Sequence, residues 1–156
     1  MALTVVFMLG LVGLLAVGWF ARRRRQAGVA APTALPADMG TLVGSFAGKY
    51  VATTVAGDAF DRIAVHGLGF RGPVTVTVTD VGLVVKIAGS HEFWIPRLEI
   101  REVGRATWTI DRAVEKDGMH LIGWSLGDRA VDSYFLMDEP VPFSAALDIL
   151  TQKQAA

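Results

Sequence analysis

The pentapeptide GWSLG, residues 123–127, matches the G-x-S-x-G pattern that presents the nucleophile of many serine hydrolases. In those enzymes the serine sits on a sharp turn between a strand and a helix, and the catalytic histidine follows it in the chain. The residues after Gly127 alternate as in a strand, and all three histidines precede Ser125: His66, His91 and His120. We therefore predict that Ser125 is a strand residue, with no catalytic residues in the chain and no enzymatic activity.

Residues 67–72 (GLGFRG) match the G-x-G-x-x-G pattern of dinucleotide-binding loops. Such a loop must open a helix whose N-terminus holds the pyrophosphate. Here Pro73 and the run VTVTVT follow, and alternating β-branched residues favour a strand. We interpret the segment as a loop without a nucleotide cofactor, in which Leu68, Phe70 and Arg71 form a candidate contact with lipid or a partner.

Composition argues against metal and nucleic-acid binding. The chain has no cysteine, and its three histidines share no ligand spacing, so no metal site is predicted. The formal net charge is zero, and the residues after Ser45 carry eleven Lys and Arg against fourteen Asp and Glu. A nucleic-acid-binding domain needs a basic face, because phosphate contacts supply much of its affinity. No nucleic-acid partner is expected.

Residues 2–21 contain no charged side chain, and a helix of this length spans roughly 30 Å, the thickness of the hydrocarbon core of a bilayer. Four consecutive arginines follow: Arg22, Arg23, Arg24 and Arg25. A cleaved signal peptide would carry its charges before the apolar run, and a core helix would not be apolar on every face. We predict a retained transmembrane helix that contacts the lipid bilayer, with Trp19 at the headgroups.

Positive residues that flank a span stay on the cytoplasmic side. We therefore expect a single-pass protein of the plasma (inner) membrane, with its N-terminus outside and its C-terminal domain in the cytoplasm. The arginines are also expected to contact anionic lipid. Residues 22–45 are predicted to form a basic stop and a flexible linker, because Pro32 and Pro36 prevent a helix and no period is sustained.

The remaining residues, 46–156, predict a mainly-β domain. The clearest strand is 74–79, where valine and threonine alternate. Further strands or alternating segments are expected at 49–55, 83–87, 92–95, 98–101, 106–110, 119–126 and 130–137, for a sheet of about seven strands. Four apolar residues then recur at helical spacing and predict a helix at 140–152: Phe143, Ala146, Leu147 and Leu150.

The hairpin VTVTDVGLVVKIAG followed by FWIPRLEIREV resembles bacterial pleckstrin-homology (PH)-like domains. The resemblance is carried by Thr79, Leu83, Val85, Ile95, Pro96, Ile100 and Val103. Over nearly its whole length the chain is similar to short actinobacterial single-span membrane proteins, often labelled transporters or export proteins. This resemblance implies a PH-like open barrel of about seven antiparallel strands, capped by the C-terminal helix.

Two functions are consistent with this organisation. The first is a membrane-tethered, non-catalytic docking or scaffold module on the cytoplasmic face, whose partner is another membrane or cytoplasmic protein or a second copy of the chain. The alternative is an accessory subunit of a transport or export system. One span cannot enclose a polar path by itself, so a transport role would require further subunits.

Overall fold

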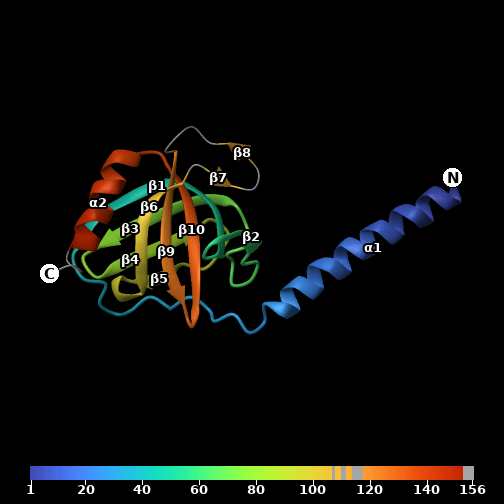
Figure 1. Cartoon of the computed structure of the whole chain (residues 1–156), viewed down its shortest axis with the longest axis horizontal. Helices are drawn as coiled ribbons and strands as arrows, with labels where there is room; N and C mark the ends of the chain where they lie inside the picture. Colours follow the sequence, from blue (N-terminus) through green and yellow to red (C-terminus); the bar gives the residue numbers. More distant parts are fainter. Residues whose placement is uncertain (107, 110–111, 114–117, 153–156) are drawn as a thin grey trace.

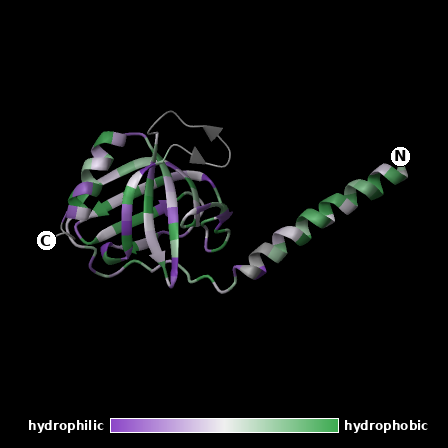
Figure 2. Ribbon diagram, viewed as in Figure 1, coloured by the Kyte–Doolittle hydropathy of each residue, from purple (hydrophilic) through white to green (hydrophobic). Residues whose placement is uncertain are grey.

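A computed structural model of the chain describes residues 1–106, 108–109, 112–113 and 118–152. The chain begins with helix α1 (Ala2–Arg25), which extends away from a compact β domain (Figure 1). Within α1, residues 3–21 form the one described helix that is long and apolar enough to cross a membrane. No residue of that stretch is buried within the protein, and Figure 2 shows the helix as a largely hydrophobic rod.

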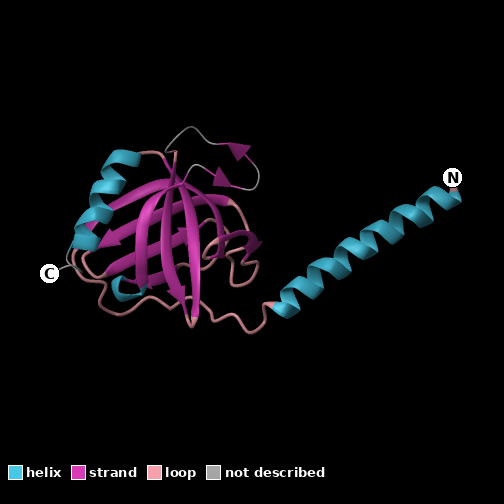
Figure 3. Cartoon of the chain, viewed as in Figure 1, coloured by secondary structure: helices cyan, strands magenta, loops and turns pink. Residues whose placement is uncertain are grey.

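The β domain contains one antiparallel sheet of eight strands, which curls around the core (Figure 3). The strands of the main path run in the order β5-β4-β3-β1-β10-β9-β6, and β2 pairs with β1. Their bounds are β1 Leu42–Val55, β2 Asp58–Arg62, β3 Gly72–Thr79, β4 Gly82–Ile87, β5 Phe93–Pro96, β6 Ile100–Ala106, β9 Met119–Leu126 and β10 Arg129–Met137. A 3-10 helix, η1 (Arg97–Glu99), joins the two edge strands, and α2 (Pro140–Gln152) follows the sheet. A separate two-stranded ribbon consists of β7 (Trp108–Thr109) and β8 (Arg112–Ala113).

Strand β1 belongs to both halves of the sheet. Its first part pairs with β3 and its second part with β10, and the register shifts between Tyr50 and Ala52. Just before this bulge, Gly48 brings β1 so close to β10 that a Cβ would lie 2.8 Å from the Met137 Cα. A bulge and a glycine bend a strand sharply, so β1 can turn from one half of the sheet into the other.

The predicted fold class is confirmed: an N-terminal apolar helix precedes an antiparallel sheet, and a helix closes the chain. Helix α2 has the predicted bounds. Strand β1 begins at Leu42, so residues 42–45, predicted as linker, belong to the sheet. Strand β2 was not predicted, because five residues of mostly exposed side chains show no apolar alternation.

The region between β5 and β9 differs most from the predicted strands. Residues 97–99 form η1 instead of a strand, and Leu98 is 89% exposed. The predicted strand at 106–110 is replaced by the end of β6 and the short β7, while Ile110 lies outside the described residues. Pro96 explains the first difference, since a proline cannot donate to the next ladder and ends the strand.

Helix α2 packs its apolar face against the open end of the sheet. Phe143, Ala146, Leu147 and Leu150 are buried in the main core cluster. The Phe143 ring meets Phe46 of β1 edge-on, at a centroid distance of 5.4 Å. The helix is thus part of the core of the β domain.

We predict that Leu147→Ala lowers the free energy of unfolding by about 2–5 kcal/mol, because it removes a fully buried side chain and leaves a cavity. Val141→Ala is the matched control, because Val141 lies in the same helix and is 75% exposed. Its effect should stay within about 0.5 kcal/mol. Urea denaturation of the full chain in detergent, followed by tryptophan fluorescence, measures both. Equal stabilities of the two variants would show that α2 does not close the core.

Candidate functional site

The residues directly after α1 are held against the β domain by hydrogen bonds. The side-chain amide of Gln26 donates to the Arg62 carbonyl oxygen at 2.7 Å and accepts from the Ala64 N–H at 2.7 Å. The imidazole Nε2 of His66 donates to the Val29 carbonyl oxygen at 2.8 Å, and Val29 is buried in the main core cluster. Gln26 immediately follows the last residue of α1, so the end of that helix is tied to residues 62–66.

Farther along, the same segment covers an edge of the sheet. The Trp94 N–H of β5 donates to the Thr33 carbonyl oxygen at 2.8 Å, which forms an isolated antiparallel bridge. We call residues 26–33 the strap. The prediction of a flexible linker from Arg22 to Ser45 therefore differs from the structure at both ends: the strap is docked, and residues 42–45 are in β1. Docking protects the edge strand β5, which would otherwise expose unpaired backbone groups.

The loop at residues 66–72 divides into a buried and an exposed part. Leu68 was predicted as a contact residue, but it is fully buried, and its carbonyl oxygen accepts a hydrogen bond from the Tyr50 hydroxyl at 2.8 Å. Leu68 is therefore part of the core and cannot contact lipid or a partner. Phe70 is 66% exposed and Arg71 is exposed, and Phe60 of β2 adds a second exposed ring that the sequence did not single out. Phe60 and Phe70 belong to the same segment between β1 and β3 as the residues that the strap binds.

The interior of the domain holds a chain of polar side chains. The indole N–H of Trp124 donates to Ser133 Oγ at 2.9 Å, and Ser133 Oγ lies 2.7 Å from Thr53 Oγ1. Thr53 Oγ1 lies 2.7 Å from the Tyr50 hydroxyl. This hydroxyl donates its single proton to the Leu68 carbonyl oxygen, so it accepts from Thr53. Because an indole only donates and a carbonyl only accepts, every bond of the chain points from Trp124 towards Leu68. Burial raises the pKa of Tyr50 far above its usual value of 10, so the phenol stays neutral and supplies no base.

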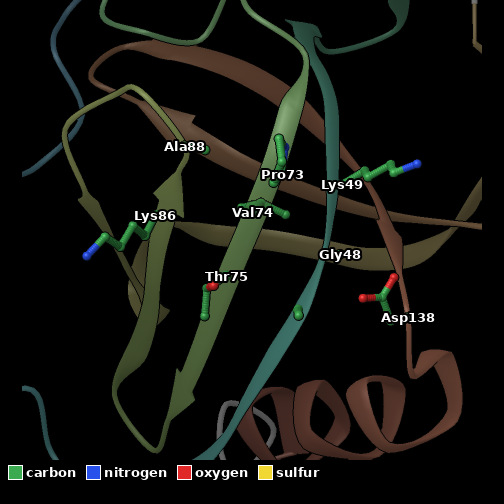
Figure 4. A pocket seen from close by; sticks show the side chains of 9 residues that line it. Gly48, Lys49, Pro73, Val74, Thr75, Lys86, Ala88 and Asp138 are labelled. Atoms are coloured by element: carbon green, nitrogen blue, oxygen red, sulfur yellow. The ribbon is translucent and has the colours of Figure 1, made fainter.

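An open groove of about 440 Å³ lies on the outer side of β1, β3 and β4 (Figure 4). Lys49 and Lys86 flank it and point away from each other, with Thr75 between them and Asp138 at the end next to Gly48. The other lining residues are Ala47, Gly48, Pro73, Val74 and Ala88. Two ammonium groups and one carboxylate on an open surface can contact charged groups of a partner. Lys49, Lys86 and Asp138 are all exposed, so the set offers no buried acid and no nucleophile activated by burial for group transfer.

His120 of β9 forms a polar cluster beneath the start of α2. Arg105 donates from Nη1 to His120 Nε2 at 2.6 Å, and Ser144 Oγ lies 2.9 Å from the same nitrogen. The Pro140 carbonyl oxygen lies 3.2 Å from the same nitrogen. A guanidinium can only donate and a carbonyl can only accept, so a neutral imidazole satisfies one of these two partners at a time, through either a lone pair or a proton on Nε2. Nδ1 is buried without a hydrogen-bond partner among the described residues. Burial, followed by the positive charge of Arg105, lowers the pKa of His120 to about 4. Arg105 and the Pro140 carbonyl oxygen compete with Ser144 for the same nitrogen, so His120 is not placed as a dedicated base that activates Ser144 as a nucleophile.

The other residues with potential chemistry are separated in the structure. Ser125 is a half-buried residue of β9 opposite Ala130, as the strand interpretation requires. His91 is exposed and His66 binds the strap. Within the described part of the chain, no group of three His, Cys, Asp or Glu residues is placed to hold a metal ion.

The predicted membrane-contact residues lie at the end of α1. Trp19 is exposed in the last turns of the apolar stretch, and the arginines Arg22, Arg23, Arg24 and Arg25 form the final helical turn. The arginines are therefore a continuation of the helix and not the start of a coil. This arrangement places the basic residues directly between the apolar stretch and the strap.

Comparison with known proteins identifies the domain at the level of its family. A family model described as bacterial PH domain-like matches residues 29–148, which include most of the strap, the whole sheet and most of α2. The curated proteins contain no match. Among solved structures, the chain is similar to the C-terminal domain of an unknown protein from Leishmania infantum, with 12% identity and a TM-score of 0.48. That alignment covers 87% of this chain and 96% of the other.

The low pKa of His120 predicts a pH dependence of stability. Between its usual value of 6.5 and about 4, the unfolded chain binds a proton at this site and the folded chain does not. The contribution of His120 to stability is therefore complete above pH 6.5 and is lost as the pH falls towards 4. His120→Gln, whose amide oxygen can still accept from Arg105, should flatten the fall in unfolding free energy between pH 7 and pH 5.

Denaturation midpoints at these pH values provide the measurement, with His91→Gln as the control because His91 is exposed. The control should follow the parent. A parent and a His120→Gln variant that lose stability in parallel would contradict the assignment of His120 as a buried neutral imidazole.

Proposed function

Because the chain belongs to the bacterial PH domain-like family, we propose that it is a membrane-tethered, non-catalytic docking module on the cytoplasmic face of the plasma membrane. PH-like domains are in general interaction modules without catalytic activity. The described residues agree with this class: the serine of GWSLG lies within a strand, and Ser144 contacts an imidazole nitrogen of His120 that Arg105 also contacts. In place of a catalytic site, the domain has exposed surfaces for binding around a complete hydrophobic core.

The observation that carries the proposal is the full exposure of the apolar stretch of α1. The β domain completes its core without that helix, since the strands, the strap, the segment between β2 and β3, and α2 supply all residues of the main core cluster. An apolar helix of 19 residues with no burial in its own protein is stable in a bilayer and unfavourable in water. The arginines at its C-terminal end favour retention of the β domain on the cytoplasmic side.

The strap supports a defined orientation of the domain on the membrane. Gln26 follows the last arginine of α1 and binds the backbone at Arg62 and Ala64. The end of the domain that carries β2 and the 66–72 loop is therefore next to the membrane, while α2 lies on the opposite side (Figure 1). We propose that Phe60, Phe70 and Arg71 contact the headgroup region, with the aromatic rings at the interface and the guanidinium near phosphate.

The outer face of β1, β3 and β4 is then available to a partner. It carries the groove with Lys49, Lys86 and Asp138, whose opposite charges suit a polar surface of another protein. A transport or export role would use the same module as an accessory subunit, because a single span leaves no polar path.

The orientation predicts the outcome of a topology experiment. A phosphatase that is active only after export, fused after Ala156, should remain inactive, because four arginines hold the β domain in the cytoplasm. A fluorescent protein that matures only in the cytoplasm should be bright at the same position. Replacing all four arginines with serine should weaken this bias. Strong phosphatase activity of the parent fusion would reverse the topology.

The loop contact predicts a difference between two labelled positions. The chain has no cysteine, so Phe70→Cys and Asp148→Cys each provide a single attachment site for an environment-sensitive dye. In nanodiscs with anionic lipid, the dye at position 70 should shift its emission to shorter wavelength and be quenched by spin-labelled headgroups. The dye at position 148, on an exposed part of α2, should show neither change. Identical behaviour at both positions would refute the contact but leave the tether intact.

A further inference from the structure

A row of polar residues crosses the outer face of the second half of the sheet. Strand pairing places Thr54 of β1 opposite Asp132 of β10, Asp132 opposite Gly123 of β9, and Gly123 opposite Glu102 of β6. Residues opposite each other on neighbouring strands lie side by side on the same face. Two acidic residues therefore stand on either side of a glycine.

Asp132 lies on the outer face of the sheet, yet its carboxylate is almost fully buried. Its side chain is 6% exposed, and Oδ2 accepts only a long hydrogen bond of 3.4 Å from the Gly57 N–H. Oδ1 has no hydrogen-bond partner among the described residues. Leaving a buried carboxylate oxygen without a partner is costly, so a group that supplies positive charge at this point would stabilise the fold.

Gly123 shows where that group would sit. A Cβ built on this glycine would lie 3.2 Å from Asp132 Oδ1 and 3.2 Å from Glu102 Oε1. It would also lie 2.7 Å from the Glu102 Cγ, so the glutamate side chain extends over the glycine towards the aspartate. The two carboxylates converge above the one position in the row that has no side chain.

The field around this point is negative. Tyr134 of β10 lies one pair along the same face, and its pKa is raised by burial and also by the charges of Asp132 and Glu102. The nearest basic residue in the row, Arg62, pairs with Thr54 on the far side from Asp132, and its Nη2 donates to the Val51 carbonyl oxygen at 2.8 Å. The arginine is thus directed to backbone and not to the two acids.

We propose that Asp132 and Glu102 bind a hard divalent cation, of the Mg²⁺ and Ca²⁺ class, above Gly123. Carboxylate oxygens are the ligands that these ions prefer, and Mg²⁺ is commonly held by one or two carboxylates while water completes its coordination. Asp132 supplies a fixed, buried oxygen, and the exposed Glu102 supplies a second that can adjust. The atoms nearest to a Cβ at Gly123 belong to the Glu102 and Asp132 side chains themselves, so an ion binds there by displacing the flexible Glu102 side chain.

The test uses the full chain in detergent after treatment with EDTA. Titration with Mg²⁺ or Ca²⁺ should raise the melting temperature to a plateau. Asp132→Asn and Glu102→Gln should each weaken the apparent affinity about tenfold or more, because each removes one of two charged ligands. Asp128→Asn, at an exposed position of the adjacent β9–β10 turn, is the control and should bind as the parent does.

A second measurement uses only the parent protein, so it does not depend on whether the variants fold. Mn²⁺ added to the ¹⁵N-labelled parent should broaden the amide signals of residues 102, 123 and 132 before those near the exposed acids Asp58 and Asp61. The proposal is overturned if no saturable binding occurs, if broadening begins at Asp58 and Asp61, or if the Asp132 and Glu102 variants respond as the parent does. It is also overturned if methylammonium, and neither metal, raises the melting temperature, since the site would then accept an ammonium group of a partner.

Discussion

The double pairing of β1 is the constraint on which the β domain depends. One strand of 14 residues forms the centre of both halves of the sheet, next to β3 at one end and next to β10 at the other. The bulge between Tyr50 and Ala52 turns the strand and reverses which side chains face inward. Tyr50 therefore faces the core, and the residues just after the bulge belong to a second, outer cluster with Met119 and Tyr134. The core, the outer face and the position of α2 all follow from this turn.

The polar chain beneath the bulge explains how the turn keeps a single register. Tyr50 and Thr53 lie on either side of the bulge, and Ser133 is the partner of Thr53 on β10. A shift of one residue in the pairing of β1 would move Thr53 to the outer face and leave Trp124, Ser133 and Tyr50 with unpaired polar atoms in the core. The same chain ends on the Leu68 carbonyl and so also positions the loop that carries Phe70.

Helix α1 and the β domain are connected by a docked segment and not by a free linker. The strap brings the end of a membrane-directed helix to the backbone of residues 62–64 and then extends along the edge strand β5. One segment thereby protects a sheet edge and, in the proposed orientation, sets the face that the domain presents to the bilayer. The groove lies on the outer face of β1, β3 and β4, and the two acidic residues lie on that of β10 and β6, so a partner and a cation would occupy different parts of the sheet.

The sequence by itself determined the elements whose pattern is local. The apolar run of α1, the alternation of β3 and the helical spacing of Phe143, Leu147 and Leu150 each depend on neighbours a few residues away. Tertiary structure alone decided which residues meet across the sheet. Leu68 and Phe70 look alike in the sequence, yet one completes the core and the other faces solvent. Asp132 reads as an ordinary outward residue of a strand, and only the pairing of β10, β9 and β6 brings its carboxylate to Glu102 over a glycine. The docking of the strap could not be predicted for the same reason. Gln26 and Thr33 form hydrogen bonds with backbone groups far along the chain, and every residue type has such groups, so no sequence pattern indicates the contact.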